Sequence, residues 1–219
     1  MIAKNIECLT QRVARCCEKS GRTPEEVKIV VVTKTAAAGQ IEEVIKSGMR
    51  ILGENRVQDA LSKYALIGER AEWHLIGHLQ TNKAKDAVRT FSLIHSVDSV
   101  RIAQAINREA AKLDKIQDVL VQVNVSGETT KFGIAAKEAE GFIKEVALYP
   151  NIKIKGLMTI APETANPEEV RPYFRALREL SDTIDEQLIL SMGMTNDFEV
   201  AIEEGSNMIR IGRFIFAKI

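Results

Sequence analysis

Two spacing patterns of apolar residues occur along this chain, one typical of helices and one typical of strands. The first is a helical stripe, in which apolar residues follow one another at steps of three or four: Ile2, Ile6, Leu9, Val13 and Cys17. Gly21 marks the end of this helix. From residue 28 onward, short runs rich in Val and Ile alternate with further helical patterns, so the chain is predicted to continue as repeated strand–helix units.

Eight strands are predicted, at residues 28–33, 50–53, 72–76, 93–97, 119–125, 152–158, 187–191 and 208–211. Predicted helices lie at 40–47 and 57–66, after a cap at Asp98 or Ser99, before Tyr149, from about residue 168, and at 198–204. The strand segments lack clean polar alternation, which is typical of parallel strands covered on both faces.

Eight such units favour an α/β fold of the (β/α)8 TIM-barrel type, with the first helix as an N-terminal addition. No G-x-G-x-x-G sequence follows the first predicted strand, so a dinucleotide-binding sheet is disfavoured. No Pro/Gly/Ser-rich linker divides the chain. We therefore expect one domain over residues 1–219, in which 161–167 is a loop after a strand.

Composition narrows the function further. Thirty Lys and Arg residues balance thirty Asp and Glu residues, so no global basic field attracts nucleic acid or anionic lipid. The longest apolar runs are far shorter than the roughly 20 residues that span a bilayer, and the N-terminus lacks signal-peptide features. We expect a cytoplasmic protein that binds neither nucleic acid nor membranes.

The cysteines and histidines do not indicate a metal site. Cys8, Cys16 and Cys17 match neither a disulfide framework nor a metal knuckle, so we interpret them as reduced thiols. His74 and His78 are four residues apart, but they fall in and after a predicted strand, where that spacing is no zinc half-site. No metal is expected.

In barrels of this type the working residues lie at the C-terminal ends of the strands. Lys34 directly follows the first predicted strand, which places its amine at the barrel mouth. A partly desolvated amine there would be nucleophilic toward an aldehyde. The alternative is a lysine that only extends from a strand end to water.

An anion site is expected near the end of the chain. The segment 191–197 follows the seventh predicted strand with small and hydroxylic residues, and 210–213 follows the eighth. Loops at these positions, with a helix N-terminus nearby, form the recurrent phosphate site of this fold. A glycine turn with a capping hydroxyl is the alternative.

Three further features stay open on the residues alone. Asn55 follows the second strand and either bonds a ligand or caps the next helix. His74 is either a ligand contact or a hydrogen-bonded histidine among core residues. The segment 126–133 is longer than a minimal turn and is a candidate mouth loop.

Taken together, these residues resemble a known family. Seven segments stand in the order in which the pyridoxal phosphate homeostasis protein family has them: 33–35, 53–58, 73–83, 95–99, 156–160, 191–194 and 210–212. Members of that family are small relatives of the barrel domain of alanine racemase. The resemblance spans nearly the whole chain.

The resemblance implies a ligand and its contacts. Lys34 would hold pyridoxal 5′-phosphate (PLP) as an internal aldimine, with Asn55 beside the ring and Arg210 at the pyridine nitrogen. The remaining residues that it implies for cofactor binding are His74, Met158, Ser191, Gly193, Met194, Asn207 and Gly212. Of these, Ser191, Gly193 and the segment around Asn207 and Gly212 would hold the phosphate.

Three positions depart from the family pattern. Asn207 stands where the family has a threonine, and Arg213 and Ala217 replace smaller residues. These departures bear on the affinity for PLP more than on its placement.

The implied function is non-catalytic: a monomer that buffers PLP or delivers it to PLP-dependent apoenzymes. Racemases of this fold take a second proton-transfer group from a further domain, and an arginine at the ring nitrogen weakens the electron sink. An amino-acid racemase that uses Lys131 or Tyr149 is the alternative, and a Schiff-base aldolase acting on a sugar phosphate is a third hypothesis.

Overall fold

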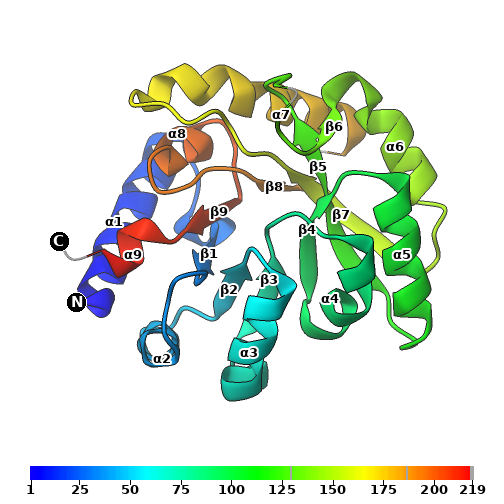
Figure 1. The fold of residues 1–219 in the computed structure, drawn as a ribbon. Helices are drawn as coiled ribbons and strands as arrows, with labels where there is room; N and C mark the ends of the chain where they lie inside the picture. Colours follow the sequence, from blue (N-terminus) through cyan, green and yellow to red (C-terminus); the bar gives the residue numbers. More distant parts are fainter. Residues whose placement is uncertain (129, 186, 218–219) are drawn as a thin grey trace.

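Eight parallel strands close into a ring in the computed structural model, which describes residues 1–128, 130–185 and 187–217 (Figure 1). The strands are β1 (Lys28–Val32), β2 (Ile51–Glu54), β3 (Glu72–Leu75), β4 (Leu93–Val97), β5 (Gln117–Asn124), β7 (Ile152–Met158), β8 (Ile189–Ser191) and β9 (Met208–Ile211). Pairing of β1 with β9 and of β4 with β5 closes the ring. The predicted barrel is confirmed.

Helices surround this ring. They are α1 (Ile2–Lys19), α2 (Ala38–Lys46), α3 (Val57–Ile67), α4 (Ala84–Thr90), α5 (Val100–Ala111), α6 (Ala139–Val146), α7 (Arg171–Ile184), α8 (Phe198–Glu203) and α9 (Arg213–Phe216). Short 3-10 turns occur at Pro24–Glu26, Gly68–Arg70, Thr81–Lys83, Ala136–Glu138 and Pro167–Val170. No helix within the described ranges is long and apolar enough to cross a membrane.

The sequence pattern located most elements to within two residues. The strands predicted at 93–97, 152–158 and 208–211 have those bounds in the structure. The side chain of Ser99 caps α5 by accepting a hydrogen bond from the N–H of Ile102 at 3.4 Å. The pattern missed α4, α9 and the two-residue strand β6 (Ile134–Ala135), which pairs with β5 outside the ring.

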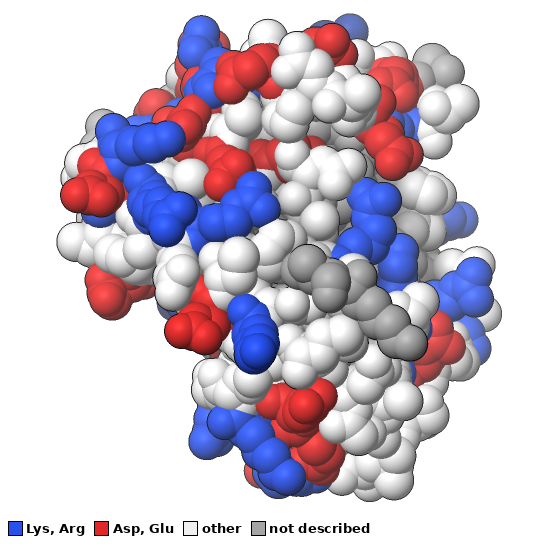
Figure 2. All heavy atoms as spheres, turned by 90° about the vertical axis from the view of Figure 1, so that its left-hand side faces the viewer, with Lys and Arg blue, Asp and Glu red and all other residues white. Residues whose placement is uncertain are grey.

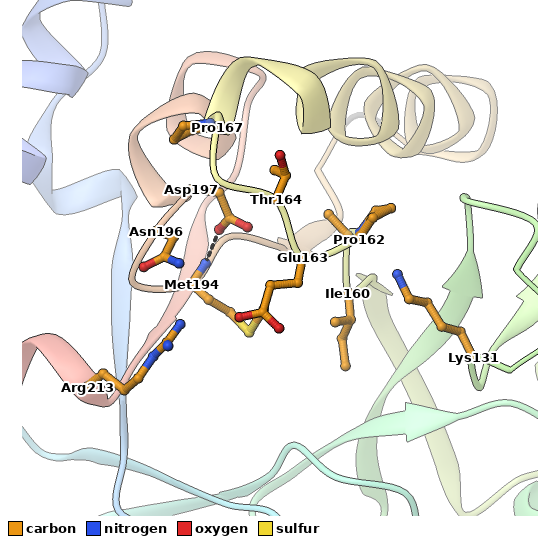
Figure 3. Close-up of a pocket in the computed structure, with 11 residues that line it drawn as sticks. Lys131, Ile160, Pro162, Glu163, Thr164, Pro167, Met194, Asn196, Asp197 and Arg213 are labelled. Atoms are coloured by element: carbon orange, nitrogen blue, oxygen red, sulfur yellow. Dashed lines mark hydrogen bonds between the residues drawn. The ribbon is translucent and has the colours of Figure 1, made fainter.

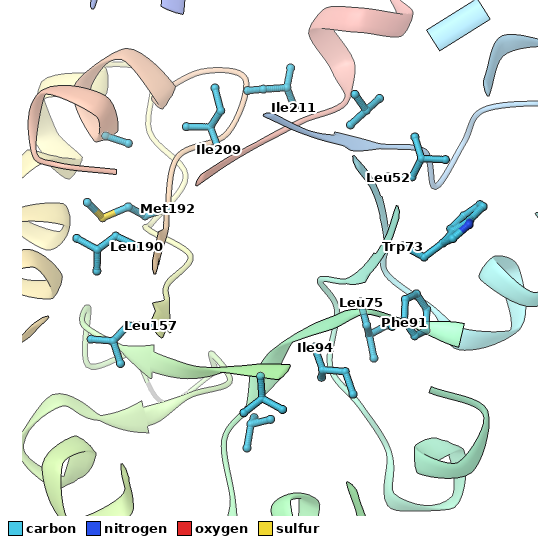
Figure 4. Packing of buried hydrophobic residues seen from close by; sticks show 14 of the residues in the cluster. Leu52, Trp73, Leu75, Phe91, Ile94, Leu157, Leu190, Met192, Ile209 and Ile211 are labelled. Carbon is cyan, nitrogen blue, oxygen red and sulfur yellow. The ribbon is translucent and has the colours of Figure 1, made fainter. Parts of the chain in front are cut away.

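The larger apolar core lies between the strands and the helices. Because successive strand residues point to opposite faces, every second side chain faces outward into this layer. Figure 4 shows such side chains around the outside of the ring: Leu52, Trp73, Leu75, Ile94, Leu157, Leu190, Ile209 and Ile211. We call this region the outer layer.

A second, smaller apolar cluster fills part of the barrel interior. It consists of Val30, Ile76, Leu93, Leu120, Met158 and Met208, all of them buried. The remaining interior positions include polar residues, among them His74, His95, Ser191 and Arg210, which are also buried. The interior is therefore a mixed region, unlike the outer layer.

The first helix is tied to the last segment of the barrel. The Asn5 side chain donates hydrogen bonds to the carbonyls of Ile215 at 3.0 Å and Ala217 at 3.1 Å. Arg12 forms an ion pair with Glu199 at 2.9 Å, and Figure 1 shows α1 beside α8 and α9. Helix α1 thus packs where the chain of strands closes.

Charges on the surface are mixed in sign. On the face in Figure 2, Lys and Arg side chains lie next to Asp and Glu side chains, without a large patch of one sign. Opposite charges also pair directly: Arg171 on α7 pairs with Glu168, Glu203 and Glu204 at 2.6 to 2.9 Å. The face in Figure 2 offers no broad basic surface for nucleic acid.

Candidate functional site

Lys34 lies at the rim formed by the C-terminal ends of the strands. Within the barrel, Val32 pairs with Gly53 on β2, and Val31 pairs with Ile211 on β9. Lys34 comes two residues after Val32, so β1, β2 and β9 all end beside it. It is an exposed residue, so the structure does not support the expected partial desolvation of its amine.

A buried polar cluster fixes the backbone directly before Lys34. The Thr33 hydroxyl donates to Oε1 of Glu54 at 2.6 Å, and Nζ of Lys63 donates to the same oxygen at 2.7 Å. Lys63 also donates to the carbonyl of Thr33 at 2.6 Å. Because Glu54 is fully buried, this charge-assisted pairing anchors the end of β1 firmly to β2 and α3.

The loop after β8 turns sharply at Gly193. Its φ of +95° lies in the left-handed region, and a Cβ there would meet the Cβ of Ala201 at 2.6 Å. Both observations require glycine. The next N–H, of Met194, donates to Oδ1 of Asp197 at 2.6 Å, and burial raises the pKa of the Asp197 carboxyl above its usual value.

Gly212 closes the same side of the rim. A Cβ on it would lie 3.0 Å from the carbonyl oxygen and 3.1 Å from the Cβ of Val32. The backbone after β9 therefore passes directly against the end of β1, two residues before Lys34. Helix α9 starts at the next residue, Arg213.

A cavity of about 280 Å³ opens beside these loops. Its lining comes from segments after β5, β7, β8 and β9: Lys131, Ile160, Ala161, Pro162, Glu163, Thr164, Pro167, Met194, Asn196, Asp197 and Arg213. Figure 3 shows Lys131 and Arg213 on opposite sides of the view, with Met194 and Glu163 between them. We call it the β8–β9 cavity. The segment 161–167 is thus a rim loop, as predicted.

A second hollow of about 400 Å³ lies at the ends of β2 and β3. It is lined by Asn55, Arg56, Val57, Gln58, Gly77, His78, Gln80 and Lys83. Above the next strand, the ring of His78 stacks on Phe132 with centroids 4.0 Å apart, and its Nδ1 lies 3.4 Å from Asp98. Phe132 therefore lies at the rim, which agrees with a mouth loop in the described part of 126–133; residue 129 lies outside the described residues.

A chain of hydrogen bonds runs through the barrel interior below the rim. Nη1 of Arg210 donates to Oγ of Ser191 at 2.7 Å, and Oγ of Ser191 lies 3.0 Å from Nδ1 of His95. Nε2 of His95 lies 3.0 Å from Nδ1 of His74. Nε2 of His74 lies 2.9 Å from Oε1 of Glu72, at the start of β3. We call these five residues the interior chain.

Backbone carbonyls also bond both Nη atoms of Arg210. Nη1 also donates to the carbonyl of Ser191 at 2.7 Å, and Nη2 donates to that of Thr159 at 2.8 Å. Burial lowers the pKa of Arg210 to about 10, so it remains a cation at neutral pH. Burial, together with the nearby charge of Arg210, lowers the pKa of His95 well below its usual value, so His95 is neutral there.

The structure separates the predicted site residues by depth. Six of them lie at the rim or just beneath it: Lys34, Asn55, Gly193, Met194, Arg210 and Gly212. Met158 is fully buried in the interior apolar cluster. His74 uses both ring nitrogens in the interior chain, which corresponds to the hydrogen-bonded core histidine of the two interpretations.

Two of the phosphate predictions need correction. Asn207 precedes β9, and its carbonyl accepts from the N–H of Lys28 at the start of β1, which is the end of the barrel opposite Lys34. Its amide bonds the backbone of Leu188 and Leu190 at 3.0 and 2.7 Å. Ser191 lies at the correct end, but its hydroxyl is buried between His95 and Arg210.

Sequence reasoning did not single out His95 and Glu72, whereas it placed the segment 53–56, with Glu54, beside Lys34 at the end of the second strand. His95 stands two residues after Leu93 on β4, so strand alternation alone places it inside the barrel. That signal was present in the sequence. The partners of His95, on β3 and β8, could not be derived from the pattern.

Comparison with known proteins gives the same fold and identifies the family to which the chain belongs. The profile of the alanine racemase N-terminal domain matches residues 5–218. A protein of Aquifex aeolicus (strain VF5) named pyridoxal phosphate homeostasis protein is 44% identical, over 98% of this chain and 97% of its own. One of the same name from Escherichia coli (strain K12) is 37% identical over 98% and 95%. The chain belongs to the pyridoxal phosphate homeostasis protein family.

Solved structures agree with this membership. PipY of Synechococcus elongatus PCC7942, solved with PLP bound, has a TM-score of 0.83 and 32% identity, over 99% of this chain and 100% of its own. Alanine racemase of Clostridium difficile 630 has a TM-score of 0.73 and 18% identity, which shows the shared fold alone. This family member covers 57% of that racemase chain.

Proposed function

We propose that this protein binds PLP through Lys34 and holds it for other proteins without turning over amino acids. The observation that carries the proposal is a primary amine at the barrel rim, where β1 ends next to β9, the strand that carries the buried and fixed Arg210. The same fold holds PLP in PipY, and relatives over nearly the full length are named for PLP homeostasis. PLP supplies an aldehyde that condenses with an amine, a phosphate dianion and a pyridine ring.

Lys34 is the amine that we assign to the aldehyde. Its nitrogen forms a C=N bond with the aldehyde carbon, and the aldehyde oxygen leaves as water with the two amine protons. The Thr33–Glu54–Lys63 cluster supports this role, because it fixes the backbone on which Lys34 stands. Asn55, on the next strand end, is assigned to the edge of the ring.

The phosphate is assigned to the β8–β9 side of the rim. Gly193 and Gly212 let the backbone approach closely there, and Met194 lines the cavity between them. Arg213 adds a guanidinium that lines the same cavity, and charge-assisted bonds to phosphate are stronger than neutral ones. This departure from the family pattern thus favours the phosphate.

The arrangement is unsuited to racemization, which needs acid and base groups on opposite faces of the substrate carbon. Tyr149 lies opposite the rim, where its carbonyl accepts from the N–H of Ile152 at the start of β7. Tyr64 and Tyr173 stand in helices α3 and α7. Arg210 stays a cation and its Nη atoms donate to the carbonyls of Ser191 and Thr159, so it is a poor source of a proton for the ring nitrogen.

Lys131 keeps the racemase alternative open to test, because it lines the β8–β9 cavity. The test is α-proton exchange of alanine and serine in deuterated solvent, followed by NMR. We expect no exchange above that of free PLP. Exchange at roughly 1 per second or faster, lost in both Lys34→Ala and Lys131→Ala, would favour the racemase.

The partners follow from a carrier role. We assign PLP-dependent apoenzymes as the recipients and a monomer as the active form. The free thiols Cys8, Cys16 and Cys17 suit the reducing cytoplasm, to which we assign the protein.

The deciding experiment is an absorbance spectrum of the purified protein incubated with PLP, followed by borohydride reduction and peptide mass mapping. We expect a near-visible band and a pyridoxyl label on the Lys34 peptide. Lys34→Ala should abolish both, and the matched control Lys83→Ala should retain them. A label on Lys83 or Lys131 in the wild type would contradict the assignment, and no band at all would favour the aldolase hypothesis.

A second measurement tests the phosphate assignment. Pyridoxal, which lacks the phosphate, should bind at least about 10-fold more weakly than PLP, since charge-assisted hydrogen bonds contribute about 1.5–3 kcal/mol. Arg213→Thr should weaken PLP and leave pyridoxal unchanged. Equal affinities for PLP and pyridoxal would remove the phosphate argument.

A further inference from the structure

The interior chain joins the two ends of the barrel. Glu72 is at the first position of β3 and its side chain is 51% exposed, whereas Arg210 is buried below the opposite rim. Between them, His95 spans the interior from β4 to Ser191 on β8. Each of the four links measures between 2.7 and 3.0 Å.

The two ends of this chain fix the direction of its first and last bonds. A guanidinium only donates, so Ser191 accepts from Arg210. An ionised carboxylate only accepts, so Nε2 of His74 carries a proton toward Glu72. The pairing with His74 lowers the pKa of Glu72, which keeps that carboxylate ionised at neutral pH.

We assign one proton to each imidazole, which leaves one proton for each link. Nδ1 of His74 is then an acceptor, so Nε2 of His95 donates to it. Nδ1 of His95 is in turn an acceptor, and the Ser191 hydroxyl donates its only proton there. All four bonds therefore point from Arg210 toward Glu72, and no proton of the chain points from Ser191 toward the rim.

We propose that Glu72 is a positioning residue for Arg210: it directs the interior chain so that the Ser191 hydroxyl donates to His95 and presents only acceptor lone pairs to Arg210, which thereby stays a fixed donor at the cofactor's ring nitrogen. The role of Arg210 as a donor to the ring nitrogen rests on the proposed function, whereas the direction of the hydrogen bonds in the interior chain does not. The role is positioning because Glu72 acts through three other side chains and lies far from the rim.

The geometry also argues against a purely structural role. A barrel interior packs well with Val, Ile and Leu, as the neighbouring apolar cluster does. Buried polar side chains are costly unless every member is bonded, and here each functional atom of the two histidines and of Ser191 has a partner. Such a network fixes one arrangement of its donors, which a cluster of methyl groups would not do.

The first experiment uses the protein without cofactor. The chain has three histidines, so ¹⁵N NMR of the imidazoles is simple, and His78→Gln assigns the third ring. We expect His74 and His95 both to carry the proton on Nε2. In Glu72→Gln, whose amide both donates and accepts, the Nε2–H fraction of His95 should fall measurably, while the control Glu140→Gln should match the wild type. An Nδ1–H form of His95 in the wild type, or an unchanged fraction in Glu72→Gln, would overturn the proposal.

The second experiment adds PLP labelled with ¹⁵N in the ring. Glu72→Gln and Ser191→Ala should both shift the ring ¹⁵N resonance and raise the PLP dissociation constant about 2- to 10-fold, the effect of one hydrogen bond. Glu140→Gln should change neither. A lower free energy of unfolding with an unmoved ring resonance would show a structural role only and overturn the positioning role.

The two experiments separate the possible failures. If PLP is not held at Lys34, the proposed function fails, and with it the positioning of a ring nitrogen, while the imidazole spectra still decide the direction of the chain. If PLP is held at Lys34 and the spectra contradict the direction, only the present inference fails.

Discussion

The outer layer and the barrel interior are built from the same strands, yet they follow different rules. Outward positions such as Leu52, Trp73 and Ile94 are apolar and meet helices. Inward positions divide between an apolar cluster and the polar interior chain. Apolar packing is non-directional, so the outer layer holds the fold together without specifying one bonding pattern. The interior specifies one pattern, because each of its polar atoms needs a particular partner.

The largest expected effect is in the outer layer. Phe174 on α7 is 1% exposed, so Phe174→Ala should lower the free energy of unfolding by about 3–5 kcal/mol. Urea denaturation of Phe174→Ala measures it. The control Leu148→Ala removes a side chain that is 80% exposed and should change stability by less than about 0.5 kcal/mol. A smaller loss in Phe174→Ala than in Ser191→Ala would break the comparison.

A glycine tests how tightly the interior is filled. A Cβ on Gly53 would meet Cγ1 of Val30 at 2.8 Å and Cδ1 of Ile76 at 3.2 Å. Gly53→Ala should therefore cost about 1–3 kcal/mol through overpacking, measured by urea denaturation. Gly39, within helix α2, has no neighbour within 4 Å, so Gly39→Ala should stabilise by about 0.5–1 kcal/mol. A neutral Gly53→Ala would indicate a loosely filled interior.

The interior should also make stability depend on pH. Burial holds the pKa of His95 well below the ordinary value of 6.5, so the unfolded chain binds a proton first as the pH falls. The contribution of neutral His95 to the free energy of unfolding should thus be fully present above about pH 6.5. Below that pH, the free energy of unfolding should fall by up to about 1.4 kcal/mol per pH unit. Thermal or urea unfolding between pH 5 and pH 8 measures this slope. His95→Gln should flatten it, whereas a slope retained in His95→Gln and lost in His78→Gln would assign it to the wrong ring.

The smallest expected effect is at the edge of the helical layer. Ser99 caps α5 through a long bond of 3.4 Å, so Ser99→Ala should cost about 1 kcal/mol or less. Ser99→Asp, which keeps a capping acceptor, should restore the wild-type value. Both are measured by thermal unfolding. A loss as large as that of Phe174→Ala would mean that end effects rival packing in this layer.

The local pattern of apolar residues was enough to predict the barrel, because each strand is recognised by its own short Val/Ile-rich run, whichever strands lie next to it. The alternation of side chains along β4 likewise places His95 inside the barrel. It does not tell which residue lies opposite, since His95 and Ser191 are brought together only by the closing of the ring. Exposure of Lys34 is likewise a property of the assembled rim.

The error on Asn207 has a simple physical cause. In a parallel barrel, only the residues that follow a strand reach the rim, and Asn207 precedes β9 while Gly212 follows it. The direction of β9 by itself therefore excludes Asn207 from the rim. The resemblance to the family led to the prediction that Asn207 contacts the phosphate, and the direction of β9 rules that contact out.

The contacts between the first and last segments of the polypeptide have a consequence for folding. Asn5 contacts Ile215 and Ala217, and β1 pairs with β9. Contacts at such large sequence separation slow folding, because a long loop must close before they form. On a ribosome, neither helix α1 nor strand β1 completes its contacts until β9 and α9 have left the exit tunnel. The barrel therefore closes only after synthesis of its last strand, and until then β1 exposes an unpaired edge for which chaperones and neighbouring chains compete.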